Sequence, residues 1–529
     1  MLDSLMVSVW TNRSPRFDSS SLGPANHRHR KRNTMKNILT MNFVGTILTA
    51  FAFLLPNNAA AELSLASPFT DNAVLQQGMP VPVWGKADAD STVTVEFGGQ
   101  KTTSVADSKG QWKVVIQPLM ASAKPNQLSV ACSTNEQKLI LNNVVVGEVW
   151  ICSGQSNMQM GVGSIPDVKE LIPASKNIRR FMVKQTVSFQ EESECVGQWD
   201  VTHPTSAVAF AFAAHLEKQA NIPVGIIQTC WGSSSIEGWM PRDMTTKLSH
   251  FGNIMKAFDA DEDKRTRIES ILSQPKWDRR SDIFLRTQPN IIYNSMMHPL
   301  APMACRGIVW YQGEANGNNI PSMLQYGETL PAWIQRYREE WDKQDLHFML
   351  VMLPGYAKGL KGQAAHPAAK SWAWIRESQM KARELPHTSV ANTIDLGDAN
   401  NIHPKDKLPI GKRLALLAAS DVLGTNLTSR GPIMNRVEAM DGKLIVHFDH
   451  ADGLNTTDGK PPTGFWIADD SAEWTAADAT LDGPSIVLAS SKLAKPLYVR
   501  YAFAGKPNVN LVNGASLPAY PFRTDNFQP

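Results

Sequence analysis

The strongest constraint on the fold is a set of five short apolar runs between Val144 and Gly424, which alternate with longer helical patterns. The runs are Val144 to Ile151, Val224 to Gln228, Gly307 to Tyr311, Phe348 to Leu353 and Val390 to Ile394. Short apolar strands that alternate with helices are typical of a parallel sheet covered by helices on both faces. Because the carboxyl ends of parallel strands meet at one edge, polar residues that follow these runs should gather there. The sequence therefore predicts an α/β core over residues 143–427 with a functional site at that edge.

A serine and a histidine follow the first and the last of these runs. Ser156 lies in a turn between Gly154 and Asn157, residues that tolerate a tight backbone and leave the hydroxyl accessible. A serine hydroxyl is a weak nucleophile until a neighbouring imidazole accepts its proton. His403, in a turn before Pro404, is the best candidate for that base. The pair predicts a site for acyl transfer, with Ser156 as nucleophile and His403 as base.

Such a site also needs fixed donors for the oxyanion that forms during acyl transfer. The backbone N–H groups of Ser156 and Gly232 are two candidates, since Gly232 follows the second run. Gln312, Glu314 and Asn316 follow the third run and complete the predicted oxyanion and substrate-binding set. Gln312 and Glu314 fit an alternative role equally well, as buried hydrogen-bonding residues that brace the loop.

Short strands separated by Gly, Asp and Asn turns occur on both sides of the predicted core. This spacing predicts a β-sandwich over residues 62–142 and a second β domain over residues 428–529. Within the core, residues 249–282 are charged and polar and fit a helical insertion or lid. A helix is predicted from Ala207 to Gln219, leading into the second apolar run.

The first 61 residues differ from the rest of the chain. Residues 35–61 have the charged start, short apolar middle and small-residue exit of a secretory signal peptide, which predicts export to the periplasm or the medium. Residues 1–34 are polar and basic and are interpreted as a wrongly assigned start or a disordered extension. The apolar middle is too short for a membrane anchor, so no membrane span is expected in the mature protein. An uncleaved N-terminal anchor is the alternative interpretation.

Composition excludes several classes of function. The formal net charge is +3, but residues 1–61 hold seven basic and two acidic residues, so the remainder carries about −2. That balance offers no basic surface for a nucleic acid. The 12 histidines are scattered, without a HExxH pattern, and the five cysteines lack paired spacing, so neither a metal nor another cofactor is expected. Cys152 and Cys230 lie in apolar segments and are interpreted as small buried residues.

Taken together, the motifs resemble the SGNH-type hydrolases, and more closely the sialate O-acetylesterase group of carbohydrate esterases. Further segments that carry the resemblance are Phe69 to Gln76, Pro82 to Gly85, Tyr293 to Leu300 and Trp372 to Gln379. The resemblance covers nearly the whole chain from Glu62 onward. It implies an SGNH-type α/β/α parallel-sheet core flanked by N-terminal and C-terminal β-sandwich-like domains. It also implies a two-step acetyl transfer through Ser156 without a metal.

The acidic partner of His403 departs from the superfamily pattern. Members place an aspartate three residues before the histidine, where this chain has Asn400. An asparagine can orient an imidazole but cannot stabilise the imidazolium as a carboxylate does. Asp398 is the favoured substitute and Asp395 is the other candidate. A Ser-His dyad helped by backbone carbonyls is the third possibility.

The leading interpretation is an exported carbohydrate esterase, similar to sialate 9-O-acetylesterases, whose substrate is an acetylated sugar or glycan. Trp231, Trp239 and Trp310 adjoin the motifs and could stack on sugar rings or fill the core. One alternative keeps the chemistry but changes the substrate to a plant polysaccharide such as xylan or pectin. A second is a sugar-binding surface protein with impaired catalysis, suggested by the missing acid before His403.

Overall fold

The structure is a computed structural model that describes residues 62–134, 137–202 and 204–529. The predicted extension 1–34 and signal peptide 35–61 lie outside the described residues. The described residues form one compact unit. None of the described helices is both long enough and apolar enough to cross a membrane.

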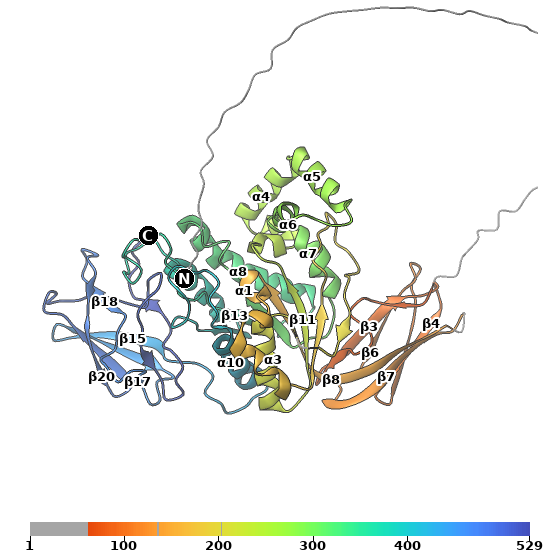
Figure 1. Ribbon diagram of the computed structural model, residues 1–529, viewed down its shortest axis with the longest axis horizontal. Coiled ribbons are helices and arrows are strands. Elements are labelled where there is room, and N and C mark those ends of the chain that lie inside the picture. The colour runs from red at the N-terminus through yellow and green to blue at the C-terminus, as the bar shows by residue number, and fades with distance from the viewer. Residues whose placement is uncertain (1–61, 135–136, 203) are drawn as a thin grey trace, which may run out of the picture. The chain divides into compact units, whose positions relative to one another are not determined.

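The central sheet of this unit contains the strands that the apolar runs predict (Figure 1). Its main path has the order β10-β9-β11-β8-β12-β13-β14. The strands are β8 (Lys138–Gly154), β9 (Ile178–Met182), β10 (Trp199–Asp200), β11 (Val224–Cys230), β12 (Gly307–Tyr311), β13 (His347–Val351) and β14 (Thr388–Ala391). All neighbours along this path pair in parallel except β10, which is antiparallel to β9.

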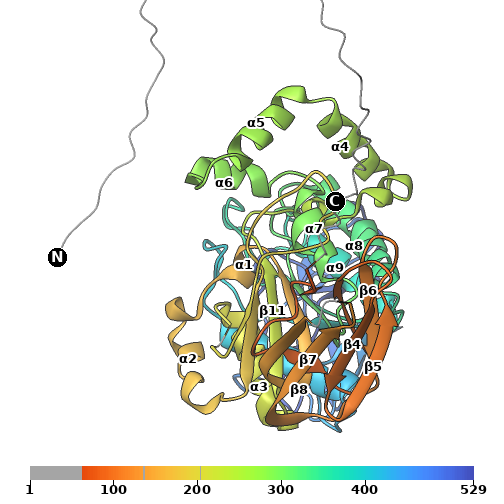
Figure 2. The same ribbon diagram turned by 90° about the vertical axis from the view of Figure 1, so that its right-hand side faces the viewer.

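Helices cover both faces of the sheet. On one face, α3 (Ala207–Ala220) packs against α10 (Lys407–Leu417), and on the other α8 (Ile320–Glu340) packs against α9 (Ala373–Lys381) (Figures 1 and 2). The start of α3 is fixed by Ser206, whose side chain accepts the Ala209 N–H. Four small helices are α1 (Ser156–Gln159), α2 (Pro166–Lys169), α6 (Arg279–Arg286) and α7 (Ile291–Met296).

The register of three adjacent strands brings their carboxyl ends to one level. In the sheet, Gly154 at the end of β8 pairs with Cys230 of β11 on one side and with Tyr311 of β12 on the other. Segments that lie far apart in the sequence therefore leave the sheet side by side. This is why the residues after these strands can form one site.

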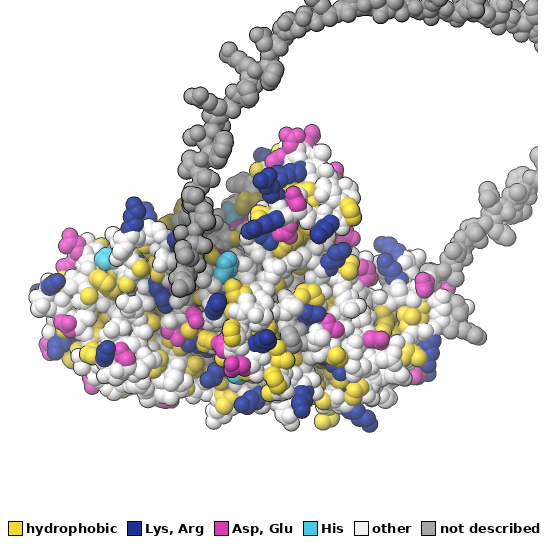
Figure 3. Space-filling view, in the orientation of Figure 1, with side chains coloured by type: hydrophobic (Ala, Val, Ile, Leu, Met, Phe, Trp, Pro, Cys, Tyr) yellow, Lys and Arg dark blue, Asp and Glu magenta, His cyan; other side chains and the backbone are white. Residues whose placement is uncertain are grey.

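The predicted insertion consists of helices between β11 and β12. It contains α4 (Ser249–Asp259), α5 (Glu262–Leu272) and α6, which follow one another as an arch above the sheet (Figure 2). Asp261 and Asp278 cap α5 and α6 by accepting backbone N–H groups. On the face shown in Figure 3, Lys and Arg side chains gather on this arch together with acidic ones.

β8 belongs to two sheets. Its first part pairs with β7 (Ser122–Cys132) in an antiparallel ladder, and its last part pairs in parallel with β11 and β12. The boundary expected between residues 142 and 143 therefore falls inside one continuous strand of 17 residues. The other N-terminal strands are β1 (Ser64–Leu65), β2 (Val74–Gln76), β3 (Val81–Lys86), β4 (Thr92–Phe97), β5 (Gln100–Val105) and β6 (Gln111–Ile116).

A second set of β-sheets follows α10. The strands are β15 (Ile433–Met440), β16 (Lys443–Asp449), β17 (Asn455–Thr456), β18 (Phe465–Ala468), β19 (Thr475–Ala476), β20 (Asp478–Asp482), β21 (Ser485–Ala489), β22 (Tyr498–Tyr501), β23 (Leu511–Val512) and β24 (Phe522–Arg523). The buried guanidinium of Arg376 on α9 donates to the carbonyls of Ala504 and Gly505 in this region. Lys506 donates from the same loop to the carbonyl of Leu396, so this domain contacts the segment that leads to His403.

Candidate active site

Ser156 begins α1, directly after the carboxyl end of β8. Gly154 has φ +136, and a Cβ added there would lie 2.1 Å from the Tyr311 carbonyl oxygen, so only glycine fits where β8 passes β12. Ser156 is partly exposed, whereas Gln155 and Asn157 on either side are buried. The backbone therefore presents the Ser156 hydroxyl outward from an otherwise buried turn.

The structure brings the predicted nucleophile and base into hydrogen-bond contact. His403 Nε2 lies 2.8 Å from Ser156 Oγ, although the two residues are 247 positions apart. Burial, together with the nearby positive charge of Lys407, lowers the pKa of His403. At neutral pH the imidazole is therefore uncharged, and Nε2 can accept the Ser156 proton when Nδ1 carries the ring proton.

No carboxylate reaches the His403 ring within the described part of the chain. Asp398 is exposed, and its Oδ1 accepts the backbone N–H groups of Asn400 at 2.7 Å and Asn401 at 2.9 Å. Asp395 forms a bidentate ion pair with Arg413. The structure thus does not bring Asp398 to the base, because its carboxylate serves a turn in the loop that carries His403.

Substituting Asp398 with asparagine should therefore have a small effect on hydrolysis. The asparagine Oδ1 can still accept both backbone N–H groups, so we expect kcat to stay within about tenfold of wild type. A triad aspartate replaced by asparagine would lower kcat by about 10⁴-fold. Steady-state kinetics on a chromogenic acetyl ester separate the two cases, and a loss of thousands-fold would restore Asp398 to the catalytic set.

Gly232 lies against Ser156, but its N–H already has a hydrogen-bond partner. A Cβ added to Gly232 would be 3.4 Å from Ser156 Cβ. The Gly232 N–H donates to Gln159 Oε1 at 2.7 Å. This predicted oxyanion donor is therefore near the reacting atoms and can serve an acyl oxygen only after Gln159 releases it.

Gln312 and Asn316 form a buried network below the turn. Gln312 Nε2 donates to Asn316 Oδ1 at 2.8 Å and to Gln155 Oε1 at 3.2 Å. Asn316 Nδ2 donates to both carboxylate oxygens of Glu237 at 3.0 and 3.1 Å. The two amide groups bond to Gln155 and Glu237 and to each other, and not to Ser156. For Gln312 this geometry matches the alternative role, that of a buried residue that braces the loop.

Glu314 is also buried, next to two residues that the sequence analysis did not single out. Its Oε1 accepts Asn157 Nδ2 at 2.5 Å, and burial raises the pKa of Glu314 to about 7. Asn157 Oδ1 in turn accepts Lys407 Nζ at 2.7 Å. Asn157 stood in the motif only as a turn residue, and Lys407 begins a helix, where a lysine ordinarily remains in water. The position of Asn157 directly after Ser156 could have pointed to its role, whereas no feature of the sequence distinguished Lys407.

The three tryptophans beside the motifs are not available to a sugar. Trp231, Trp239 and Trp310 are at most 1% exposed, so the stacking role is wrong and the core-filling role is confirmed. The partly exposed Trp277, just before α6, lies parallel to Trp231 with ring centroids 6.2 Å apart. Trp231 directly precedes Gly232, and its Nε1 donates to Asp282 of α6 at 3.0 Å, so Trp277 packs where the Gly232 turn meets the helical arch.

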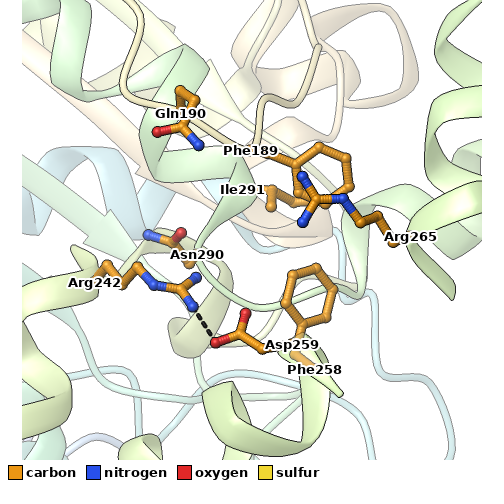
Figure 4. Close-up of a pocket in the computed structure, with 8 residues that line it drawn as sticks. All are labelled: Phe189, Gln190, Arg242, Phe258, Asp259, Arg265, Asn290 and Ile291. Carbon is orange, nitrogen blue, oxygen red and sulfur yellow. Dashed lines mark hydrogen bonds and ion pairs between the residues drawn. The ribbon is translucent and has the colours of Figure 1, made fainter. Parts of the chain in front are cut away.

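A cavity of about 320 Å³ lies between the arch and the segments around residues 190 and 290 (Figure 4). Arg242 pairs there with Asp259, and the Arg265 guanidinium lies 4.9 Å from the Phe189 ring centroid. Its lining includes neither Ser156 nor His403. The cavity is therefore separate from Ser156 and His403.

The described residues contain no cluster of three or more His, Cys, Asp or Glu side chains that could hold a metal ion. All five cysteines are free and buried, including Cys152 and Cys230 in the central sheet.

Comparisons with known proteins relate most of the chain to esterases. The family described as carbohydrate esterase, sialic acid-specific acetylesterase, matches residues 146–274 and 273–419. Sialate O-acetylesterase of Homo sapiens is 28% identical over 514 residues, covering 88% of this chain and 93% of that protein. The Mus musculus protein of the same name is 28% identical over 484 residues, covering 83% and 89%. A crystal structure of a carbohydrate acetylesterase from Xanthomonas citri has a TM-score of 0.74 and 31% identity, covering 88% of this chain and 100% of that one.

Proposed function

The chain belongs to the sialic acid-specific acetylesterase family of carbohydrate esterases, and on that ground we propose that it removes O-acetyl groups from sugars through an acyl-enzyme on Ser156. The observation that carries this proposal is the hydrogen bond between Ser156 Oγ and His403 Nε2. We also infer an SGNH-type core between two β-sandwich-like domains. The central sheet with helices on both faces supports that inference.

In the first half-reaction, Ser156 Oγ attacks the acetyl carbonyl carbon while His403 Nε2 takes the hydroxyl proton. The backbone N–H groups of Ser156 and Gly232 stabilise the oxyanion, after the acyl oxygen has displaced Gln159 Oε1 from Gly232. The bond to the sugar oxygen then breaks, and that oxygen receives the proton from His403. The sugar leaves as a free alcohol and the acetyl group stays on Ser156.

In the second half-reaction, His403 removes a proton from water, and the resulting hydroxide attacks the acetyl carbonyl. The bond between the acetyl carbon and Ser156 Oγ then breaks, Oγ regains a proton from His403, and the product leaves as acetic acid, which ionises to acetate in water. Because Asp395 and Asp398 are engaged elsewhere, we infer that the pair works as a dyad. Its imidazolium is then stabilised less than in a Ser-His-Asp triad.

For the substrate, we propose an O-acetylated sialic acid as the leading candidate. The mammalian relatives carry the name sialate O-acetylesterase, which supports this choice. The Xanthomonas citri relative carries the broader name carbohydrate acetylesterase, which keeps acetylated plant polysaccharides such as xylan and pectin as the second candidate.

Acetate release from a panel of O-acetylated sialic acid, acetyl-xylan and acetylated pectin tests the proposal. We expect the highest kcat/KM on the sialic acid. Release from xylan or pectin alone would support the esterase activity but would show that the substrate is a plant polysaccharide and not a sialic acid. If the folded protein releases no acetate from any of these or from 4-nitrophenyl acetate, but still binds glycans, it is a sugar-binding protein with impaired catalysis.

We further propose that the protein is exported, on the strength of the signal-like residues 35–61. Mass spectrometry of the protein recovered from the periplasm or medium of the native cells should give a mature chain that begins near Glu62. Recovery of the full-length chain in the cytoplasm would contradict export.

Trp277 should contribute to sugar binding but not to chemistry. Its ring is partly exposed and packs on Trp231, so replacement by alanine removes an aromatic surface beside the site. We expect Trp277→Ala to raise KM for the acetylated sugar about 2- to 10-fold, the range of one aromatic contact, with kcat/KM for 4-nitrophenyl acetate unchanged. Trp466→Ala, which changes a partly exposed tryptophan of β18, is the control. Equal KM values in all three proteins would contradict this role.

A further inference from the structure

One side chain next to the nucleophile joins the two catalytic loops. Asn157 follows Ser156, and its Nδ2 donates to the backbone carbonyl of Ile402 at 3.0 Å. Its Oδ1 accepts Lys407 Nζ at 2.7 Å. Ile402 directly precedes His403, and Lys407 is the first residue of α10. Asn157 therefore ties the serine turn to both ends of the segment that carries the histidine.

The charged partners of Asn157 are buried. Lys407 is fully buried and Glu314 is 3% exposed, with Asn157 hydrogen-bonded to each. Burial lowers the pKa of Lys407 to about 8, because an ammonium group loses hydration there. Glu314 Oε2 has no hydrogen-bond partner among the described residues. Buried charges that are only partly compensated are costly, and titratable groups in such surroundings cluster at functional sites.

We propose that Asn157 and Lys407 are positioning residues: the chain of hydrogen bonds from Lys407 Nζ through the Asn157 amide to the Ile402 carbonyl is a latch that sets the approach of His403 to Ser156. The inference rests on the proposed function and adds residues that act through the catalytic pair. Among the described residues, two hydrogen bonds join the serine turn to the loop before α10: the Ser156–His403 contact and the bond from Asn157 to the Ile402 carbonyl. Loss of the latch leaves only the first.

The charge of Lys407 adds a second effect. Burial is the largest cause of the lowered pKa of His403, and the positive charge of Lys407 is the second. The other charged groups at this corner are Glu314 from the β12 loop and Asp406 beside α10, both of which act on Lys407, and the exposed Asp398. A neutral residue at position 407 should therefore raise the pKa of His403. The acid limb of kcat/KM should then move to higher pH, because more of the imidazole is protonated at any given pH.

A pair of lysine variants provides the test. Lys407→Met removes the charge and the latch donor, whereas Lys405→Met removes an exposed lysine two residues away. On 4-nitrophenyl acetate we expect Lys407→Met to lower kcat roughly 10- to 100-fold with little change in KM, as for a misplaced catalytic group, and to shift the acid limb upward. Lys405→Met should leave both unchanged.

Asn157→Ala separates the two effects. It breaks the latch but keeps the Lys407 charge, so kcat should fall while the acid limb stays in place. Thermal melting checks that each variant is folded, and Lys407→Gln replaces Lys407→Met if the latter does not melt cooperatively. Wild-type kcat and an unmoved acid limb in a folded Lys407 variant would overturn the proposal.

An NMR titration of the His403 ring protons needs no turnover, so it tests Lys407 even if the protein releases no acetate. We expect a higher His403 pKa in the Lys407 variant than in the wild type, and equal values would count against the proposal. Activity in the wild type combined with unaffected Lys407 and Asn157 variants would reject the latch and leave the esterase function standing.

Discussion

Ser156→Ala should abolish acetate release, with kcat lower by about 10⁴-fold or more. The variant has no oxygen to form the acyl-enzyme, and the members of a catalytic pair act as a unit, so the remaining residue cannot compensate. The side chain is partly exposed and its Oγ contacts His403, so its loss leaves the core packing intact and the melting temperature should hardly change. Acetate release from 4-nitrophenyl acetate and from the acetylated sugar measures the effect.

Ser153→Ala is the matched control for this experiment. Ser153 lies near the end of β8, three residues before Ser156, is fully buried, and its Oγ has no hydrogen-bond partner among the residues that the structure describes. Removing an unpaired buried hydroxyl should leave kcat within a few-fold of wild type. If Ser156→Ala keeps more than a few per cent of the activity, Ser156 is not the nucleophile.

The second large effect is expected for His403→Ala. Without the imidazole, the Ser156 proton has no acceptor in the first step and water has no base in the second, so kcat should fall by about 10³- to 10⁶-fold. The double variant Ser156→Ala/His403→Ala should be no worse than Ser156→Ala alone, because both substitutions remove the same step.

His387→Asn provides a matched control for His403→Ala. His387 is exposed and has φ +52, a backbone conformation that asparagine also tolerates. This variant should retain wild-type kcat. Additive losses in the double variant, or near-normal activity of His403→Ala, would show that the 2.8 Å contact is not used in catalysis.

The elements that the sequence predicts well are those whose periodicity reflects burial alone. The apolar runs became the parallel strands, and the helix predicted from Ala207 to Gln219 is present as α3, one residue longer. Ser156 and His403 could be paired from the sequence because both follow strands of the parallel sheet, whose carboxyl ends meet at one edge. Site residues whose placement follows from strand order and from their chemical type could therefore be predicted from the sequence.

Features that depend on side-chain direction were not accessible. Asp398 is close to His403 in the chain, but its carboxylate turns to the backbone N–H groups of Asn400 and Asn401. The tryptophans adjoin the motifs yet point into the core, which adjacency in the sequence cannot reveal. Lys407 occupies a helical position that is ordinarily solvated, and its burial beside Asn157 follows from the tertiary packing of α10.

The strand shared by two sheets limits how this protein can be divided. A recombinant fragment that starts at residue 143 would begin in the middle of β8 and would lose the part that pairs with β7. The remaining part of β8 would then have no β7 partner and would form a free sheet edge of the kind that promotes aggregation. Exchange of the N-terminal region between relatives should therefore use joints before β7 or after Gly154. A joint at either place keeps β7 and the whole of β8 from the same parent, so the hydrogen-bonded pairing between them is preserved.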